Sequence, residues 1–157
     1  MIDVNLTGAW HTAKAAIPHL KDRGRGGSII FINSTGGLTG VENIGHYVAA
    51  KHGLVGLMRS LALELASDRI RVNSVHPGSV DTDMIQNEAT YAIFAPDLHE
   101  GARNRESLAV RFQSANALPI PWMEPRDISN AVLWLASEES RNMTGVALPV
   151  DAGQMAK

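Results

Sequence analysis

The sequence predicts an α/β fold built around a parallel β-sheet. Three short apolar segments rich in β-branched residues are separated by longer segments whose apolar residues recur at helical spacing. Parallel strands need a long crossover between them, and an intervening helix is the usual one, with a right-handed path. At 157 residues the chain is long enough for one domain with a substantial core.

The first two elements are a helix and a strand. Residues 4–20 place apolar side chains at helical spacing, and a basic turn followed by glycines ends the pattern. Residues 28–33 (SIIFIN) are short, apolar and β-branched, which predicts a strand covered on both faces. Ser34, Thr35 and the glycines after them predict a loop at the end of this strand.

Later segments continue the alternation. Residues 44–66 predict a long helix, and residues 69–75 predict a strand that His76-Pro77-Gly78 stops. A helix over 127–136 and a strand over 147–150 follow. Between them, residues 83–125 contain four prolines and no strand pattern, so we expect a partly helical lid or substrate loop there.

Composition excludes several classes of function. The formal charge is -2, from 14 basic and 16 acidic residues, and no basic run offers a footprint for nucleic acid. The chain has no cysteine, and its six histidines show no metal-ligand spacing, so we expect no metal. Its apolar stretches are too short to span a bilayer, and no signal core follows Met1. We therefore expect a cytoplasmic protein that binds no membrane.

Tyr47 and Lys51 are the strongest candidates for chemistry. Residues four apart on a helix are neighbours, and a lysine cation beside a phenol stabilises tyrosinate and lowers the phenol pKa. That pairing suits general acid/base catalysis. Ser34 follows a strand, where open α/β sheets bind ligands, and its hydroxyl could hold a substrate oxygen.

Two other interpretations of these residues remain open. Taken alone, Tyr47 and Lys51 could be a surface tyrosine and a solvated lysine, because this spacing is common in helices. Ser34 could be a hydrolase nucleophile, but that role needs Gly-x-Ser-x-Gly, and the sequence around it is Ile-Asn-Ser-Thr-Gly.

Six motifs in order resemble the C-terminal part of the short-chain dehydrogenase/reductase family. They are Asp3-Val-Asn5-Leu, Ser34 after its strand, Tyr47-Val-Ala-Ala-Lys51, Arg71-Val-Asn73, Pro77-Gly78-Ser-Val80-Asp-Thr82, and Thr144-Gly145 ahead of Val150-Asp-Ala-Gly153. The resemblance implies a Rossmann-like, doubly wound parallel sheet that lacks its N-terminal strands, with residues 1–157 as a single partial domain.

The resemblance also implies a reaction and its residues. It implies an NAD(P)-dependent oxidoreductase that interconverts an alcohol and a carbonyl in a small-molecule substrate. Tyr47 would exchange the proton, Ser34 would hold the substrate oxygen, and Lys51 would lower the Tyr47 pKa. Asn5 would keep a water in a proton relay to Lys51, although asparagine is also a favoured helix N-cap.

Cofactor binding is implied for a second set of residues, with NAD favoured over NADP. Pro77 and Gly78 could equally form an ordinary turn at the end of a strand. The segment from Met84 to Trp122 resembles the substrate loop of mycofactocin-associated, carveol dehydrogenase-like members, which hold their cofactor tightly. The cofactor-binding residues are Tyr47, Lys51, Pro77, Gly78, Val80 and Thr82.

The glycine-rich turn of the family, Thr-Gly-x-x-x-Gly-x-Gly, does not occur in these residues. We therefore expect a truncated gene product or a fragment, with an exposed sheet edge and poor solubility. The alternative function is a non-catalytic remnant or oligomerisation module that cannot bind dinucleotide. In the full-length form, the two long helices would build a homodimer or homotetramer.

Overall fold

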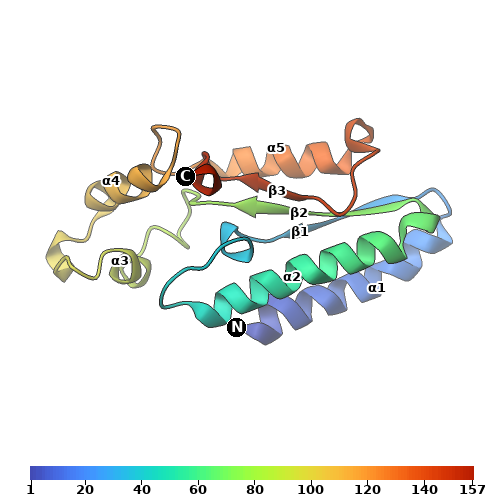
Figure 1. The fold of residues 1–157 in the computed structure, drawn as a ribbon, viewed down its shortest axis with the longest axis horizontal. Helices are drawn as coiled ribbons and strands as arrows, with labels where there is room; N and C mark the ends of the chain where they lie inside the picture. The colour runs from blue at the N-terminus through green and yellow to red at the C-terminus, as the bar shows by residue number, and fades with distance from the viewer.

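The computed structural model describes all of residues 1–157 and confirms the α/β class (Figure 1). Three parallel strands, β1 (Gly27–Ile32), β2 (Ile70–Pro77) and β3 (Ala147–Val150), lie in the order β1-β2-β3. Helices α1 (Gly8–Asp22) and α2 (Gly45–Glu64) cover one face of the sheet, and α5 (Pro125–Ala136) covers the other. The result is three layers, as expected for strands that alternate with crossover helices.

The register brings the carboxyl ends of all three strands to one edge. Ile32 pairs with Val75 at the end of β1, and Pro77 pairs with Val150 at the end of β3. The loops that carry the candidate residues leave the sheet at this edge. Open α/β sheets bind their ligands there.

The core lies between the sheet and the two helices α1 and α2. Gly53 lets the helices meet closely, because a Cβ added to it would lie 2.9 Å from Leu6 Cδ2. Gly56, one turn further along α2, has no atom within 4 Å of such a Cβ and therefore has no comparable role in packing. The buried cluster contains Ala13, Phe31, Leu54, Val55, Met58, Leu61, Ala62, Leu65, Ile70 and Val72.

Two predicted boundaries need correction. The helix predicted over 4–20 begins as a π-helical turn, Asp3–Thr7, in which Gly8 N–H donates to Asp3 O, and it continues to Asp22. Strand β2 is not stopped by His76-Pro77, because both residues pair with β3. Proline is tolerated there since it lies at the strand end, and the next N–H, that of Gly78, donates to Val150 O at 3.0 Å.

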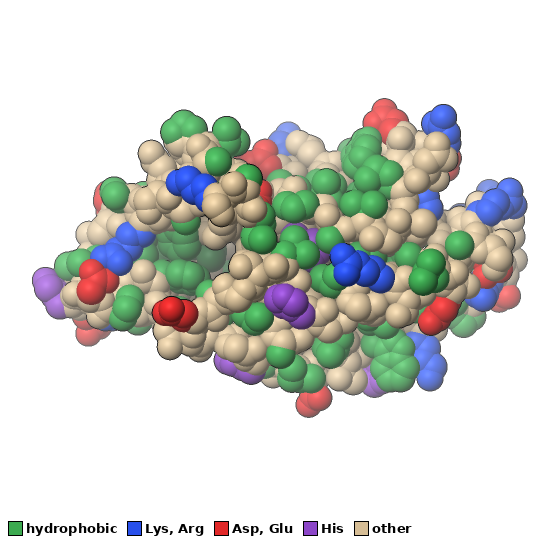
Figure 2. Space-filling view, in the orientation of Figure 1, with side chains coloured by type: hydrophobic (Ala, Val, Ile, Leu, Met, Phe, Trp, Pro, Cys, Tyr) green, Lys and Arg blue, Asp and Glu red, His purple; other side chains and the backbone are tan.

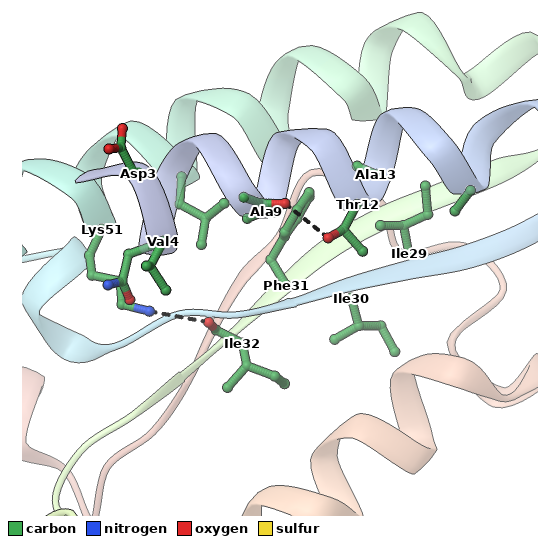
Figure 3. A pocket seen from close by; sticks show the side chains of 14 residues that line it. Asp3, Val4, Ala9, Thr12, Ala13, Ile29, Ile30, Phe31, Ile32 and Lys51 are labelled. Atoms are coloured by element: carbon green, nitrogen blue, oxygen red, sulfur yellow. Dashed lines mark hydrogen bonds between the residues drawn. The ribbon is translucent and has the colours of Figure 1, made fainter. Parts of the chain in front are cut away.

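Strand β1 is less covered than predicted. It forms the edge of the sheet, and the Ile32 side chain is 51% exposed, because β2 is its only neighbour. A groove of about 690 Å³ runs between this edge and α1 (Figure 3). Residues of α1, of β1 and of α2 line it, including Asn5, Thr12, Ile30 and Lys51.

Residues 83–125 are partly helical, as predicted. Helices α3 (Glu88–Phe94) and α4 (Arg105–Ala115) extend beyond the carboxyl ends of the strands (Figure 1). Tyr91, Ala95, Leu108 and Phe112 give this segment a small core of its own. The space-filling view shows a hollow between the segment and the rest of the molecule, with hydrophobic side chains in its floor (Figure 2).

Candidate active site

Ser34 is held at the end of β1 with its hydroxyl proton free. Its Oγ accepts a hydrogen bond from Gly36 N–H at 3.1 Å, and its carbonyl accepts one from Gly37 N–H at 2.9 Å. These contacts close the short 3-10 turn Thr35–Gly37. Because the backbone donor occupies one lone pair of Oγ, the O–H group remains available to donate to a ligand.

Tyr47 and Lys51 lie one turn apart on α2, as predicted. The Lys51 ammonium is 5.5 Å from the centroid of the Tyr47 ring and donates to Ile32 O at 3.4 Å (Figure 3). Lys51 is only 8% exposed, and this burial lowers its pKa. Its Nζ carries three protons, so two donors remain for a ligand in the groove.

Gly36 lies between the serine and the tyrosine. A Cβ added to Gly36 would lie 3.3 Å from Tyr47 Cε1 and 3.5 Å from Ser34 Oγ. The phenol ring and the hydroxyl thus both border the space that a side chain at Gly36 would enter. The tertiary structure therefore brings Ser34, Tyr47 and Lys51 together, although thirteen residues separate the first two in sequence.

The loop after β1 is fixed against the helix that carries the lysine. Asn33 Nδ2 donates to Lys51 O at 3.1 Å, whereas Asn33 Oδ1 is buried and has no partner. A Cβ on Gly37 would lie 2.8 Å from Asn33 Oδ1 and 2.9 Å from Lys51 O, which leaves no room for a side chain. The Asn33 amide and the absence of a side chain at Gly37 thus set the distance between loop and helix. Sequence reasoning missed Asn33, although its place directly before Ser34 marked it.

Asn5 occupies the groove but does not cap the helix. It lies inside the π-helical turn, and its Nδ2 donates to Met1 O at 3.2 Å, so the N-cap interpretation is wrong. Both Asn5 and Lys51 line the groove beside β1. Single π turns occur often at functional sites, because they re-aim a side chain within a helix.

The second candidate set follows β2. Gly78 packs so tightly that an added Cβ would lie 3.1 Å from Asp151 Cα. Val80 forms an isolated parallel bridge with Met123, and Thr82 Oγ1 donates to Val80 O at 3.4 Å. Pro77 directly follows His76, whose Nδ1 lies 2.7 Å from Ser34 O. The turn from Pro77 to Thr82 therefore starts beside the serine.

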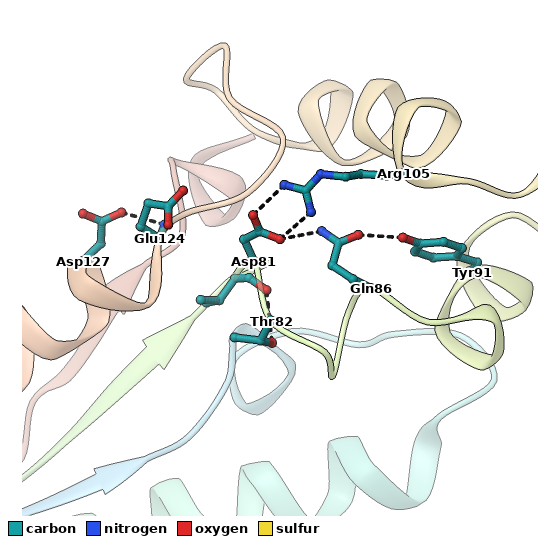
Figure 4. A network of polar contacts seen from close by, with 8 residues as sticks. Asp81, Thr82, Gln86, Tyr91, Arg105, Glu124 and Asp127 are labelled. Carbon is teal, nitrogen blue, oxygen red and sulfur yellow. Dashed lines mark hydrogen bonds and ion pairs between the residues drawn. The ribbon is translucent and has the colours of Figure 1, made fainter.

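Two further residues at this edge were missed in the sequence. His76 is fully buried and joins the ends of β1 and β2, and its only signal was its place next to Pro77. Asp81 accepts from Arg105 and Gln86 (Figure 4). Arg105 lies 24 residues away in sequence, so no local pattern could indicate this pair.

Neither a metal site nor a membrane span is found. No three His, Asp or Glu side chains are grouped so that they could hold a metal ion. None of the helices has the length and apolar character needed to cross a bilayer. The chemistry available at the site is that of hydroxyl, phenol, amine and amide groups.

Comparison with known proteins identifies the class. Residues 1–155 match the family model described as enoyl-(acyl carrier protein) reductase. With the parallel sheet and the six ordered motifs, this match shows that the chain belongs to the short-chain dehydrogenase/reductase family, of which it represents a C-terminal portion.

Similar proteins include (-)-trans-carveol dehydrogenase of Rhodococcus erythropolis, which is 59% identical over the whole chain and 56% of that relative. The crystal structure of carveol dehydrogenase from Mycobacterium avium in complex with NAD matches with a TM-score of 0.96 and 53% identity, covering 100% of this chain and 56% of that one. The crystal structure of a short chain dehydrogenase from Mycobacterium paratuberculosis bound to NAD matches with a TM-score of 0.83 and 39% identity. That match covers 99% of this chain and 55% of the other. The chain thus spans about half the length of these relatives.

Proposed function

We propose that residues 1–157 form the catalytic portion of an NAD(P)-dependent oxidoreductase that interconverts an alcohol and a carbonyl. The observation that carries this proposal is that Ser34 and Tyr47 both border the position of a Cβ on Gly36, with the Lys51 ammonium 5.5 Å from the centroid of the Tyr47 ring. A hydroxyl donor, a phenol and a buried amine at the carboxyl edge of a parallel sheet match the needs of carbonyl reduction.

Each side chain has a task that follows from its contacts. In the direction of reduction, the free Ser34 O–H donates to the carbonyl oxygen and polarises it, and the Tyr47 phenol delivers a proton to that oxygen. The Lys51 ammonium stabilises the tyrosinate that remains. Asn5 lies in the same groove as Lys51 and would hold the water that returns the proton. A bound nicotinamide supplies or accepts the hydride.

The donor set fits the nicotinamide end of a dinucleotide. Lys51 has two free N–H groups for ribose hydroxyls, and Pro77, Gly78, Val80 and Thr82 form a tight turn next to Ser34 with little side-chain bulk at Gly78. NAD is favoured over NADP because the carveol dehydrogenase and the second dehydrogenase structure named above were both solved with NAD.

The substrate of the whole protein is proposed to be a small apolar alcohol or ketone. The support is the 59% identity to the enzyme named (-)-trans-carveol dehydrogenase, together with the hydrophobic hollow beside the α3–α4 segment. Carveol is therefore the first substrate to test. We propose that residues 83–125, whose helices extend beyond the carboxyl ends of the strands, contact this substrate.

The proposal is tested on the full-length polypeptide that contains these residues, and on the 157-residue chain in parallel. We expect carveol-dependent reduction of NAD, and we expect Tyr47→Phe to lower kcat about 10²- to 10⁴-fold. Calorimetry should show that Tyr47→Phe binds the dinucleotide with an affinity within threefold of that of the wild type. Activity retained in Tyr47→Phe would refute the proton role. Absence of any dinucleotide affinity in either polypeptide would favour the non-catalytic remnant.

We further propose that the outer faces of α1 and α2 pack against a second copy of the chain. Trp10 on α1 is 45% exposed and Leu63 on α2 is 82% exposed. Large apolar side chains therefore lie on the surface of both helices, as at many protein–protein contacts. Sedimentation of the wild type and of Leu63→Glu tests this idea. We expect a dimer or tetramer that the substitution dissociates, and an unchanged oligomer would exclude this face.

A further inference from the structure

His76 links the two sides of the candidate active site through a buried chain of polar groups. Its Nδ1 lies 2.7 Å from Ser34 O, and its Nε2 lies 2.8 Å from Ser74 Oγ. His76 and Ser74 are both fully buried, so water does not compete for these hydrogen bonds. These hydrogen bonds connect Ser74 in the middle of β2, through His76, to Ser34 at the end of β1.

The partners define the state of the ring. A backbone carbonyl can only accept, so Nδ1 carries the proton and donates to Ser34 O. The Ser74 hydroxyl then donates to Nε2, and every polar atom of a neutral imidazole is satisfied. Burial is the main cause that lowers the pKa of His76. The hydrogen bond to Ser34 O raises this pKa, and the nearby groups Lys51, Arg59 and His52 lower it further.

The carbonyl that accepts from His76 belongs to the residue whose hydroxyl faces the substrate. Ser34 O accepts from two donors, the His76 Nδ1–H and the Gly37 N–H at 2.9 Å. With Oγ already bonded to Gly36 N–H at 3.1 Å, this fixes both the carbonyl group and the side-chain oxygen of Ser34. The remaining freedom of the serine is the rotation of its O–H bond.

We propose that His76 is a positioning residue for the reaction, because its Nδ1–H holds the Ser34 carbonyl and thereby aims the Ser34 hydroxyl at the substrate oxygen. The inference rests on the proposed oxidoreductase function. His76 touches neither substrate nor cofactor in this role and takes no part in proton transfer. Displacing a catalytic group lowers the rate of the reaction more than it weakens substrate binding. We therefore expect the loss of His76 to lower kcat.

Asparagine and leucine provide a matched pair of substitutions in the full-length polypeptide. The amide of asparagine can place an N–H near the position of Nδ1, whereas leucine has almost the same shape and no donor. We expect His76→Leu to lower kcat about 10- to 100-fold with the KM for NAD within twofold, and we expect His76→Asn to recover most of the loss. Equal losses in both variants would overturn the proposal.

A second comparison shows whether the effect passes through the serine. In a Ser34→Ala background no hydroxyl remains to be aimed, so His76→Leu should lower kcat by less than threefold further. A full loss in that background would overturn the proposal. If His76→Leu does not fold, His76→Gln replaces it, because glutamine places its amide near Nε2 and leaves Ser34 O without the donor.

The ring itself provides a readout that does not need activity. In ¹⁵N-histidine spectra of the wild type at pH 8, His76 should be protonated at Nδ1 only. A ring protonated at Nε2 overturns the assigned hydrogen bond. A wild type that reduces NAD with neither carveol nor any other small apolar alcohol overturns the proposed function and the catalytic half of this inference. The spectrum then decides separately whether His76 holds Ser34.

Discussion

Arg105 binds both carboxylate oxygens of Asp81, with Nη1 2.7 Å from Oδ1 and Nη2 2.6 Å from Oδ2 (Figure 4). The pair joins the start of α4 to the turn that follows β2. Gln86 Nε2 adds a hydrogen bond to Asp81 Oδ1 at 2.8 Å, and the Arg105 guanidinium lies 4.7 Å from the centroid of the Trp122 ring. One carboxylate therefore anchors the α3–α4 segment next to Val80 and Thr82.

We expect Asp81→Asn to loosen the α3–α4 segment without unfolding the protein. Because the pair is partly exposed, the global free energy of unfolding should fall by no more than ~1 kcal/mol. Amide hydrogen exchange in residues 83–125 should rise clearly, since the bidentate anchor is lost. Asp97→Asn is the matched control, because its partner Arg111 lies within the same segment. Similar exchange in both variants would exclude the anchoring role.

The anchor should depend on pH and salt in a definite direction. The Arg105 guanidinium and the Gln86 amide hold the pKa of Asp81 below its ordinary value. A carboxylate with a lowered folded pKa contributes its stabilisation above the ordinary value of about 3.9, and loses it as pH falls through the folded pKa. Protection factors in the segment, which correct for the base-catalysed rise of intrinsic exchange with pH, should therefore be constant from pH 5 upward at low salt and should fall in 1 M salt, which screens the pair. A loss of protection between pH 5 and 7 would contradict this assignment.

Gly36 should be intolerant of a side chain for a functional reason. The Cβ of Gly36→Ala would lie 3.3 Å from Tyr47 Cε1, so the ring must move by a few tenths of an ångström. We expect kcat to fall about tenfold while stability changes by less than ~1 kcal/mol. Gly40→Ala is the control, because nothing lies within 4 Å of its Cβ. Equal kcat values in the two variants would disprove the close approach of loop and ring.

The buried Lys51 side chain should lower the free energy of unfolding of the wild type. Its pKa is lowered by burial, so the folded state disfavours the charged form. We expect Lys51→Met to raise the free energy of unfolding by about 1 kcal/mol at pH 7 while activity is lost. The difference should shrink as pH rises from the lowered folded pKa toward the ordinary lysine pKa of about 10.4, because the folded state loses its proton before the unfolded chain does. A destabilised methionine variant in urea titrations would show that the hydrogen bond to Ile32 O outweighs desolvation.

His76 should make the wild type sensitive to mild acid. Burial lowers its pKa, so the folded state keeps the ring neutral while the unfolded chain binds a proton below about pH 6.5. The unfolded state then binds more protons, and the free energy of unfolding falls as pH falls below that value. Urea titrations from pH 8 to 5 should show this slope in the wild type and a smaller slope in His76→Asn. Identical slopes would mean that His76 titrates alike in both states.

Several elements were predictable because their signals are local. The strand 147–150 and the helix that carries Tyr47 and Lys51 follow from periodicity and spacing, and both are observed. The strand end at Pro77 was mispredicted, because pairing with β3 decides where β2 ends and turn residues alone do not. The burial of β1 was overpredicted for a similar reason, since apolar character does not reveal which strand lies at the edge.

The sequence by itself determined the class of fold, the ordered motifs and the one-turn spacing of phenol and amine, since each depends on residues that are neighbours along the chain. The tertiary structure alone decided that Gly36 lies between Ser34 and Tyr47, that His76 holds the Ser34 carbonyl, and that Arg105 binds Asp81. These contacts join residues on different elements, and only the register of the sheet and the packing of helices on it bring their atoms within hydrogen-bonding range.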